Sequence, residues 1–260
     1  MSDPVDWLSM HGDLRRHGVE QAATQLLDKY RSRWPKIVPP ELHRLAASLS
    51  ARIVAIDNLE GDARLVPAFG GFVVLVQREL ASSRYGRFRT CIAHELVHTL
   101  FYSKADARPR RLCEPSKAEE YFCFDVARRV LAPHWLLEAT GVRTMSEAEP
   151  IFRMLVETFK LSRPVAARVM LEDYELVRGI AGRWSRQHGR WELNRGSTYA
   201  TPLLTEAERK TLRQVTREWL ESAAEPATPH CVIGTIESSG DSAFVVVEAR
   251  CADASTHGSV

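Results

Sequence analysis

The feature that most constrains this chain is the segment HELVH, residues 94–98, because its neighbours are apolar on almost every side of a helix. Those neighbours are Ile92, Ala93, Leu96, Val97, Leu100 and Phe101. Such a helix is expected inside a folded core, where His94, Glu95 and His98 become buried polar groups that need partners. Solvated surface histidines are the alternative, but they do not suit these neighbours. The segment therefore predicts a helix over 85–103 that carries a metal site.

The spacing of these three polar residues also indicates a chemistry. Two histidines four residues apart lie about 40° apart around a helix, so both imidazoles can reach one ion. Glu95, beside the first histidine, is then placed to take a proton from water and return it to a leaving amine. Zinc suits these ligands, since it lowers the pKa of water to about 7 and polarises a carbonyl. We expect a zinc peptidase with His94 and His98 as ligands and Glu95 as base.

A third protein ligand is expected on the next predicted helix, residues 116–131, so that one metal position stays open for water. Glu119 and Glu120 are the candidates. At about 100° per residue, Glu120 falls within the apolar arc of this helix and Glu119 at the arc's edge. A carboxylate in an apolar arc needs compensation, which favours Glu120 as the ligand. Glu119 is then expected to support the site or cap the helix, and a salt-bridged surface glutamate is the alternative.

Two stretches of the chain carry a family resemblance. Residues 89–98, RTCIAHELVH, resemble the R-F-T-x-A-H-E-x-x-H signature of the ImmA/IrrE metallopeptidases. Residues 120–133, EYFCFDVARRVLAP, look like that family's second signature, a glutamate followed by a helix ending in L-L-M-P. The resemblance covers roughly residues 40–178 and implies that Glu120 is the third zinc ligand. It also implies a zincin-like α+β domain, mainly helical with a small sheet.

The chain departs from the family pattern at three positions that are not ligands. Val97 stands where the family usually has Gly, Thr90 where it has Phe, and Phe124 where it has Asn. The larger residue at 97 is expected to alter how the catalytic helix packs. The resemblance implies a bacterial or phage regulatory role in which a helix-turn-helix repressor is cleaved.

Two rival functions remain at this point. A regulatory module could keep the fold and bind a protein without cutting it, but the intact HELVH with Glu120 favours an enzyme. A DNA-binding regulator rests only on arginines that alternate with Trp184 and Trp191, and half-buried tryptophans explain this segment better. Direct binding to nucleic acid is therefore not expected. We expect a zinc-dependent endopeptidase whose partner is a protein substrate.

Composition and termini favour a cytoplasmic protein. A net charge of +2, with 45% apolar and 26% charged residues, creates no strong field toward nucleic acid or membrane. No apolar run is long enough to span a bilayer, and the first residues lack a secretory signal pattern. The five cysteines show no C-x-x-C spacing and indicate reduced thiols.

Three regions are expected along the chain: an N-terminal helical segment (1–39), the metallopeptidase domain (40–178) and a smaller α+β accessory region (179–260). Further helices are predicted over 19–34, 40–49, 146–160, 162–177 and 205–222. Strands are predicted over 52–56 and 71–76, near Trp184 and Trp191, and in a hairpin of 231–237 with 243–249. The accessory region is expected to choose or gate the substrate.

Weaker features concern the surroundings of the site. Cys91 and Cys123 are either small hydrophobic residues or a redox-sensitive alternative ligand pair. Tyr102 and His134 are candidate donors to an oxyanion, although sequence does not fix their positions. A basic flank either steers an acidic substrate segment or is solvated, and it comprises Arg84, Arg87, Arg89, Arg108, Arg110 and Arg111.

Overall fold

A computed structural model describes most of the chain, namely residues 4–10, 12–33, 39–145, 147–188, 190–202, 204–222, 230–236 and 242–249. The chain divides into two compact units, Met1–Val142 with Leu155–Ser162, and Arg143–Met154 with Arg163–Val260. Both units combine helices with a sheet, so the α+β class is confirmed. The division does not coincide with the boundaries predicted after residues 39 and 178.

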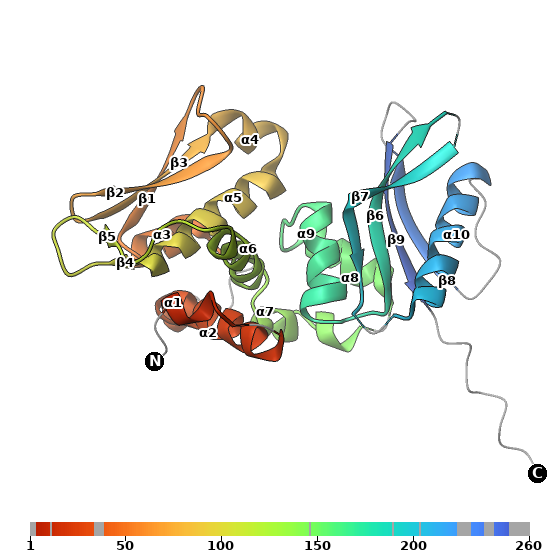
Figure 1. The fold of residues 1–260 in the computed structure, drawn as a ribbon, viewed down its shortest axis with the longest axis horizontal. Helices are drawn as coiled ribbons and strands as arrows, with labels where there is room; N and C mark the ends of the chain where they lie inside the picture. The colour runs from red at the N-terminus through yellow and green to blue at the C-terminus, as the bar shows by residue number, and fades with distance from the viewer. Residues whose placement is uncertain are drawn as a thin grey trace, which may run out of the picture. The chain divides into compact units, whose positions relative to one another are not determined.

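The first unit is built mainly of helices (Figure 1). They are α1 (Pro4–Trp7), α2 (Gly12–Arg33), α3 (Leu42–Ser48), α4 (Arg78–Ser83), α5 (Tyr85–His98), α6 (Lys117–Leu131) and α7 (His134–Ala139). The predicted helix over 85–103 is too long, because α5 ends at His98 and a 3₁₀ turn (Thr99–Phe101) follows. The chain then forms a two-stranded ribbon of β4 (Tyr102–Ser103) and β5 (Arg110–Arg111).

A three-stranded sheet packs against α5 in this unit. Its strands are β1 (Ala51–Ile56), β2 (Ala63–Ala68) and β3 (Gly71–Gln77), in the order β1-β3-β2. β1 runs parallel to the central β3 and β2 runs antiparallel. Strand β2 was not predicted, because it contains Pro67; an edge strand tolerates a proline because one side of it makes no ladder. Gly71 is required at the start of β3, since a Cβ there would lie 1.9 Å from the Ser50 carbonyl oxygen.

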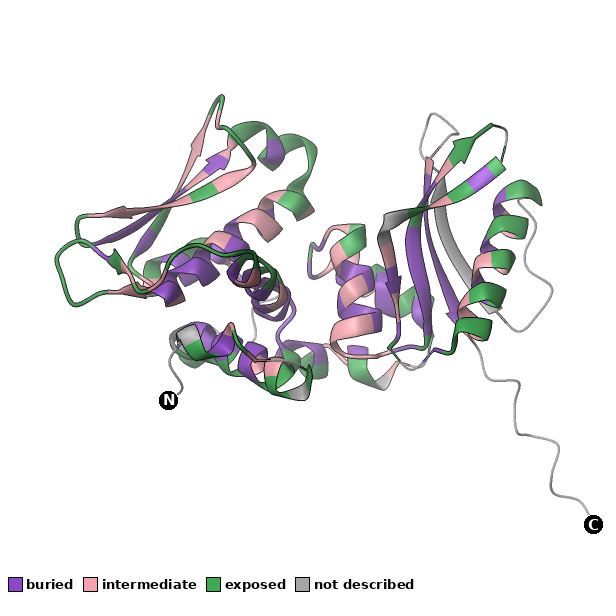
Figure 2. Ribbon diagram, in the orientation of Figure 1, coloured by how far each residue is buried: buried purple, intermediate pink, exposed green. Residues whose placement is uncertain are grey.

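The core of the first unit surrounds α5 (Figure 2). Ile92, Ala93, Leu96 and Val97 are each no more than 1% exposed, which confirms a helix buried on nearly all sides. On α6, Ser116 caps the first turn by accepting a hydrogen bond from the Glu119 N–H at 3.1 Å. The sequence pattern therefore placed the start of α6 correctly.

Two ion pairs connect helix α2 to helix α6. Arg15 lies 2.8 Å from Asp125, and the buried Arg129 lies 3.0 Å from Glu20. The helix predicted over 19–34 began too late, because α2 starts at Gly12. Its early turns are polar, so the apolar spacing that marks the later turns is absent from them.

The second unit is a four-stranded antiparallel sheet with helices on both faces. The strands are β6 (Gly179–Gln187), β7 (Arg190–Ala200), β8 (His230–Ile236) and β9 (Ser242–Ala249), in the order β7-β6-β9-β8. The predicted hairpin of β8 and β9 is confirmed. The helices are α8 (Ala148–Glu157), α9 (Arg163–Arg168) and α10 (Glu206–Ser222). The division between the units falls within α8, since Leu155–Ser162 belong to the first unit.

The two faces of this sheet have separate cores. On one face, Trp184 and Trp191 pack with Leu212 of α10. On the other, Phe244 of β9 stacks on Phe152 of α8 with ring centroids 6.3 Å apart. Alternate residues of a strand face opposite sides, which explains how one sheet serves both cores. The two tryptophans are at most 5% exposed, so the predicted half-buried positions are in fact fully buried.

In this unit the start of α10 was predicted correctly, but the end of the helix before the sheet was not. Thr205 and Glu208 form the expected reciprocal capping box at the start of α10, with bonds of 2.8 and 3.2 Å. The helix predicted over 162–177 is too long, because α9 gives way to a π-helical turn at Val169–Asp173. Ser146, the 225–229 linker and the 238–241 turn lie outside the described residues. Within the part of the chain that the structure describes, no helix is long and apolar enough to cross a bilayer.

Candidate metal centre

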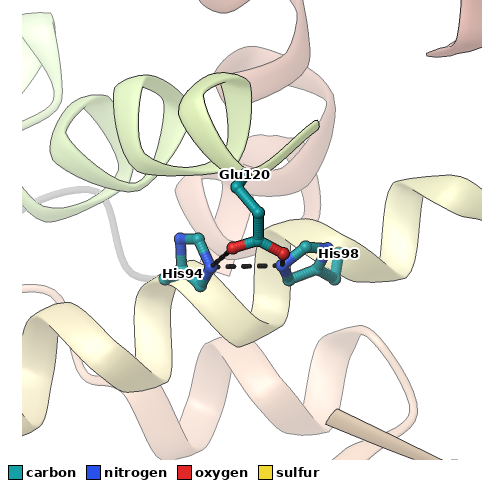
Figure 3. Close-up of side chains that lie close together, drawn as sticks. All are labelled: His94, His98 and Glu120. Carbon is teal, nitrogen blue, oxygen red and sulfur yellow. Dashed lines mark hydrogen bonds and ion pairs between the residues drawn. The ribbon is translucent and has the colours of Figure 1, made fainter. Parts of the chain in front are cut away.

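Two neighbouring helices bring three ligand-type side chains together (Figure 3). His94 and His98 lie in the last turns of α5, and Glu120 lies in the first turn of α6. The Nε2 atoms of the two histidines are 3.1 Å apart. The Glu120 carboxylate bridges them, with Oε2 3.1 Å from His94 Nε2 and Oε1 3.5 Å from His98 Nε2.

The spacing of these atoms suits one small cation. Neighbouring ligand atoms of a tetrahedral zinc site lie about 3.3–3.6 Å apart, given bonds of about 2.0–2.2 Å. The three separations here are 3.1, 3.1 and 3.5 Å, so small shifts of the side chains would suffice. Both histidines are buried, whereas 52% of the Glu120 side chain is exposed. The cluster therefore reaches solvent beside Glu120, where a water or substrate can approach.

His98 is supported by charged groups behind it. Its Nδ1 lies 2.6 Å from Oε1 of Glu119, which is only 1% exposed. Arg111 donates to the other oxygen of Glu119 at 2.5 Å. Burial raises the pKa of Glu119, but the hydrogen bonds from His98 and Arg111 outweigh it and leave that pKa below its usual value. An ionised Glu119 accepts only, so His98 Nδ1 donates and His98 Nε2 keeps a lone pair for a metal.

His94 has a different, apolar environment. The Phe124 ring lies 4.0 Å from the His94 ring, centroid to centroid, with the planes tilted by 35°. His94 Nδ1 is buried and has no hydrogen-bond partner among the described residues. Burial, with a smaller contribution from His98, lowers the pKa of His94 to about 3. The imidazole is therefore neutral near pH 7, as a metal ligand must be.

Glu95 is held between α5 and the edge strand β2. Its Oε2 accepts a hydrogen bond of 2.7 Å from the Leu65 backbone N–H. Burial raises the pKa of Glu95, while His98 and the Leu65 N–H act in the opposite direction. A carboxylate with a raised pKa, fixed beside the two histidines in sequence, is suited to exchange protons near neutral pH.

The predicted burial of the two glutamates was wrong. Glu119, assigned to the edge of the apolar arc, is buried, whereas Glu120, assigned to its middle, is exposed. Arg128 and Arg129 of the same helix are also buried, and Phe124 is 44% exposed. The reason is that α6 is covered by α2 as well as by α5, so ion pairs allow its charged face to be buried too. Glu120 nevertheless faces the histidines, and Glu119 both meets a histidine and receives the helix cap.

The two cysteines near the site carry protonated thiols in the metal-free chain. Burial raises the pKa of Cys91 to about 12, and Asp62, 3.7 Å away, adds to the effect. Burial likewise raises the pKa of Cys123 well above its ordinary value. Both thiols are therefore protonated, whereas metals bind the thiolate. Cys91, Cys113 and Cys123 are free of disulfides.

The predicted basic flank is not one surface. Arg87 pairs with Asp62 at 2.5 Å, and Arg110 pairs with Asp106 at 3.1 Å. Arg89 is only 4% exposed and donates to a backbone carbonyl. With Arg111 bonded to Glu119, three arginines of the flank are paired with carboxylates and Arg89 is buried, which weakens the case for steering of an acidic substrate.

The two candidate oxyanion donors differ in their contacts, because the Tyr102 hydroxyl acts as an acceptor and keeps its own O–H as a donor, whereas His134 contacts a carboxylate. The Tyr102 hydroxyl accepts a bond from Arg111 at 3.4 Å, and His134 lies 3.4 Å from Glu138 in α7. Arg111, Phe124 and the Leu65 N–H are the site groups whose roles the sequence did not reveal. Two of them had a signal, since Arg111 was part of the basic flank and Phe124 was a departure from the family pattern, but neither signal indicated the role.

Comparison with known proteins adds information on the fold. No known protein-family model matches this chain, and no curated protein matches its sequence. A solved structure described as a Mycobacterium tuberculosis transcriptional regulator is similar to it with a TM-score of 0.52 and 11% sequence identity. The match covers 95% of this chain and 81% of that chain. At this identity the likeness concerns the fold alone.

Proposed function

We propose that this chain is a zinc-dependent endopeptidase of the ImmA/IrrE type with a zincin-like fold. The observation that carries the proposal is the convergence of His94 Nε2, His98 Nε2 and the Glu120 carboxylate within 3.5 Å of one another, next to Glu95. Surface histidines would not be buried together with their lone pairs aimed at a shared carboxylate. The donor set of two imidazoles and one carboxylate is also the set that leaves zinc a reactive fourth position.

The chain's own groups supply the proton transfers. Zinc, when bound, would lower the pKa of water and polarise the scissile carbonyl. Glu95 takes the proton from the attacking water and delivers it to the departing amine nitrogen. Burial favours its protonated form after the first transfer, and the Leu65 N–H keeps the carboxylate in place.

The edge strand supports a peptide as substrate. β2 pairs with β3 along one side only, and the Leu65 N–H on its other side is turned toward Glu95. An extended peptide can hydrogen-bond to such an edge, which would lay its backbone beside the catalytic carboxylate. A helix-turn-helix repressor is our proposed substrate class, supported by the resemblance of residues 89–98 and 120–133 to the ImmA/IrrE signatures.

A second candidate is a regulatory module that binds its partner without cutting it. The similar solved structure is described as a transcriptional regulator, which favours a regulatory setting for this fold. The two candidates differ in what they require of Glu95, because a binding module has no use for a general base.

The test combines metal analysis with one conservative substitution. The purified chain should contain about one zinc per molecule, and Glu95→Gln should keep that zinc. Loss of a general base should slow cleavage by about 10²–10⁴-fold, so the physiological target should accumulate intact in Glu95→Gln cells compared by proteomics with wild type.

Glu60→Gln, at an exposed position, is the matched control and should behave as wild type. A chain without zinc would end the proposal. Target levels that are equal in wild type and Glu95→Gln, but altered in Glu120→Ala, would favour the non-cutting module.

A further inference from the structure

The ribbon that follows α5 returns the chain to the metal centre. Tyr102 pairs with Arg111 and Ser103 pairs with Arg110, and the Leu112 N–H donates to the Phe101 carbonyl at 2.9 Å. This fold-back carries the side chain of Arg111, which follows the end of α5 at His98 by 13 residues (111 − 98), to the rear of that histidine. The positive charge that Arg111 brings behind His98 therefore comes from the ribbon and not from α5 or α6.

Every nitrogen of the Arg111 guanidinium is engaged. Nε donates to the Cys113 carbonyl at 3.0 Å, one terminal nitrogen lies 3.4 Å from the Tyr102 hydroxyl, and the other donates to Glu119 at 2.5 Å. The guanidinium also lies over the Tyr102 ring, 5.2 Å from its centroid, within the limit of about 6 Å for a cation–π contact. A planar fork held at each nitrogen has one orientation, which lysine could not reproduce.

Glu119 joins this fork to His98. Its side chain is 1% exposed, one carboxylate oxygen meets Arg111 and the other meets His98 Nδ1. Its backbone N–H is fixed in turn by Ser116. A buried carboxylate is costly unless all its oxygens are satisfied, so the two contacts stabilise one another.

We propose that Arg111 and Glu119 are positioning residues that hold His98 in the tautomer and ring orientation required for the metal. The inference rests on the proposed zinc site. Glu119 accepts a hydrogen bond from His98 Nδ1–H, which leaves the Nε2 lone pair directed toward His94 and Glu120. Arg111 acts through Glu119, keeping the carboxylate ionised and aimed.

The same residues do not form a second cation site. His98 Nδ1, Glu119 and Cys123 lie close enough to be considered as ligands, with Cys123 Sγ 3.5 Å from Nδ1. The Arg111 charge already occupies one Glu119 oxygen, so a cation there would face a guanidinium 2.5 Å from its ligand. The group is better described as the support of His98.

The experiment measures metal affinity in the full chain. Glu119→Gln presents an amide whose nitrogen must face either His98 Nδ1–H or Arg111, so a donor opposes a donor. Zinc affinity, measured by competition with a chelator, should fall about 10–100-fold. Arg111→Met should lower the affinity in the same direction, and Arg111→Lys should recover part of it because the charge remains without the fork. Arg110→Met, on the exposed neighbour, should leave it unchanged.

A spectroscopic measurement separates positioning from general loss of structure. The visible absorption of the Co²⁺-loaded chain reports ligand geometry, and it should change in Glu119→Gln and Arg111→Met but not in Arg110→Met. Should Glu119→Gln fail to fold, Arg111→Met and Arg111→Lys carry the same test. Wild-type affinity and spectrum in folded Glu119→Gln, or in both Arg111 variants, would overturn the inference while the zinc site stands. A wild-type chain that binds no zinc would instead overturn the proposed function.

Discussion

His94 and His98 lie one turn apart on α5 and are almost equally buried, at 6% and 7% exposure, yet their surroundings differ in kind. Behind His98 stands an ionised pair, Glu119 and Arg111, with the short contacts of charge-assisted hydrogen bonds. Beside His94 lies the Phe124 ring, and His94 Nδ1 has no partner among the described residues.

The difference teaches that two equivalent-looking ligands in one motif can be oriented by different forces. His98 is oriented by directional bonds, which fix both its proton and its ring plane. His94 is oriented by packing, which restricts the ring but leaves its proton without an acceptor. We expect the His98 side of the centre to be the rigid one and the His94 side to be the one that tolerates change.

The largest effect should come from removing either histidine. His98→Ala and His94→Ala each delete a ligand, so metal affinity should fall by more than the about 10–100-fold that supporting residues contribute. Metal content after dialysis against a chelator measures this. His134→Ala, which removes a half-exposed histidine paired with Glu138, is the control and should retain wild-type content. If either alanine variant kept full zinc occupancy, the ligand assignment would be incorrect.

A smaller effect is expected in the pH dependence of the metal-free chain. The pKa of His94 is about 3 in the folded state against an ordinary 6.5, so between these values the unfolded chain binds the extra proton. The free energy of unfolding should therefore fall as the pH falls below about 6.5, by at most about 1.4 kcal/mol per pH unit for one proton.

Urea unfolding at several pH values between 5 and 8, with chelator present, measures that slope. His94→Gln removes the titrating group and should flatten the slope relative to wild type. Glu95 acts in the opposite sense, because its folded pKa is raised and the folded chain then holds the proton more tightly. The comparison of His94→Gln with wild type cancels this contribution, and equal slopes would show that burial of His94 does not govern its protonation.

Local pattern was enough to predict the helix that carries HELVH and its burial. The neighbours of HELVH are apolar at every spacing, so any fold that forms this helix must surround it. The start of α6, the capping box at Thr205 and the hairpin of β8 with β9 were predicted for the same reason, since each depends on residues close in sequence.

The features that the sequence did not predict depend on contacts between distant segments of the chain. The burial of Glu119 requires Arg111 from the ribbon, and the burial of Arg129 requires Glu20 from α2. β2 was missed because Pro67 is acceptable only at an edge, which is a property of the sheet and not of the strand. The compact units also divide the chain elsewhere than at the predicted boundary after 178, because residues of α8 and α9 contact the second sheet. Phe152 stacks on Phe244, and Arg168 lies over Tyr199.

The smallest effect is expected on the His94 side. Phe124→Ala removes the ring that packs on His94, and such aromatic contacts are worth about 0.5–1.5 kcal/mol. Zinc affinity should therefore fall by about 2–10-fold, less than in Glu119→Gln, with little change in the Co²⁺ spectrum because no hydrogen bond is lost. Phe124→Leu, which keeps apolar bulk, should recover most of the affinity. A loss in Phe124→Ala as large as that in Glu119→Gln would mean that packing orients His94 as firmly as the ion pair orients His98, and the contrast between the two sides would fail.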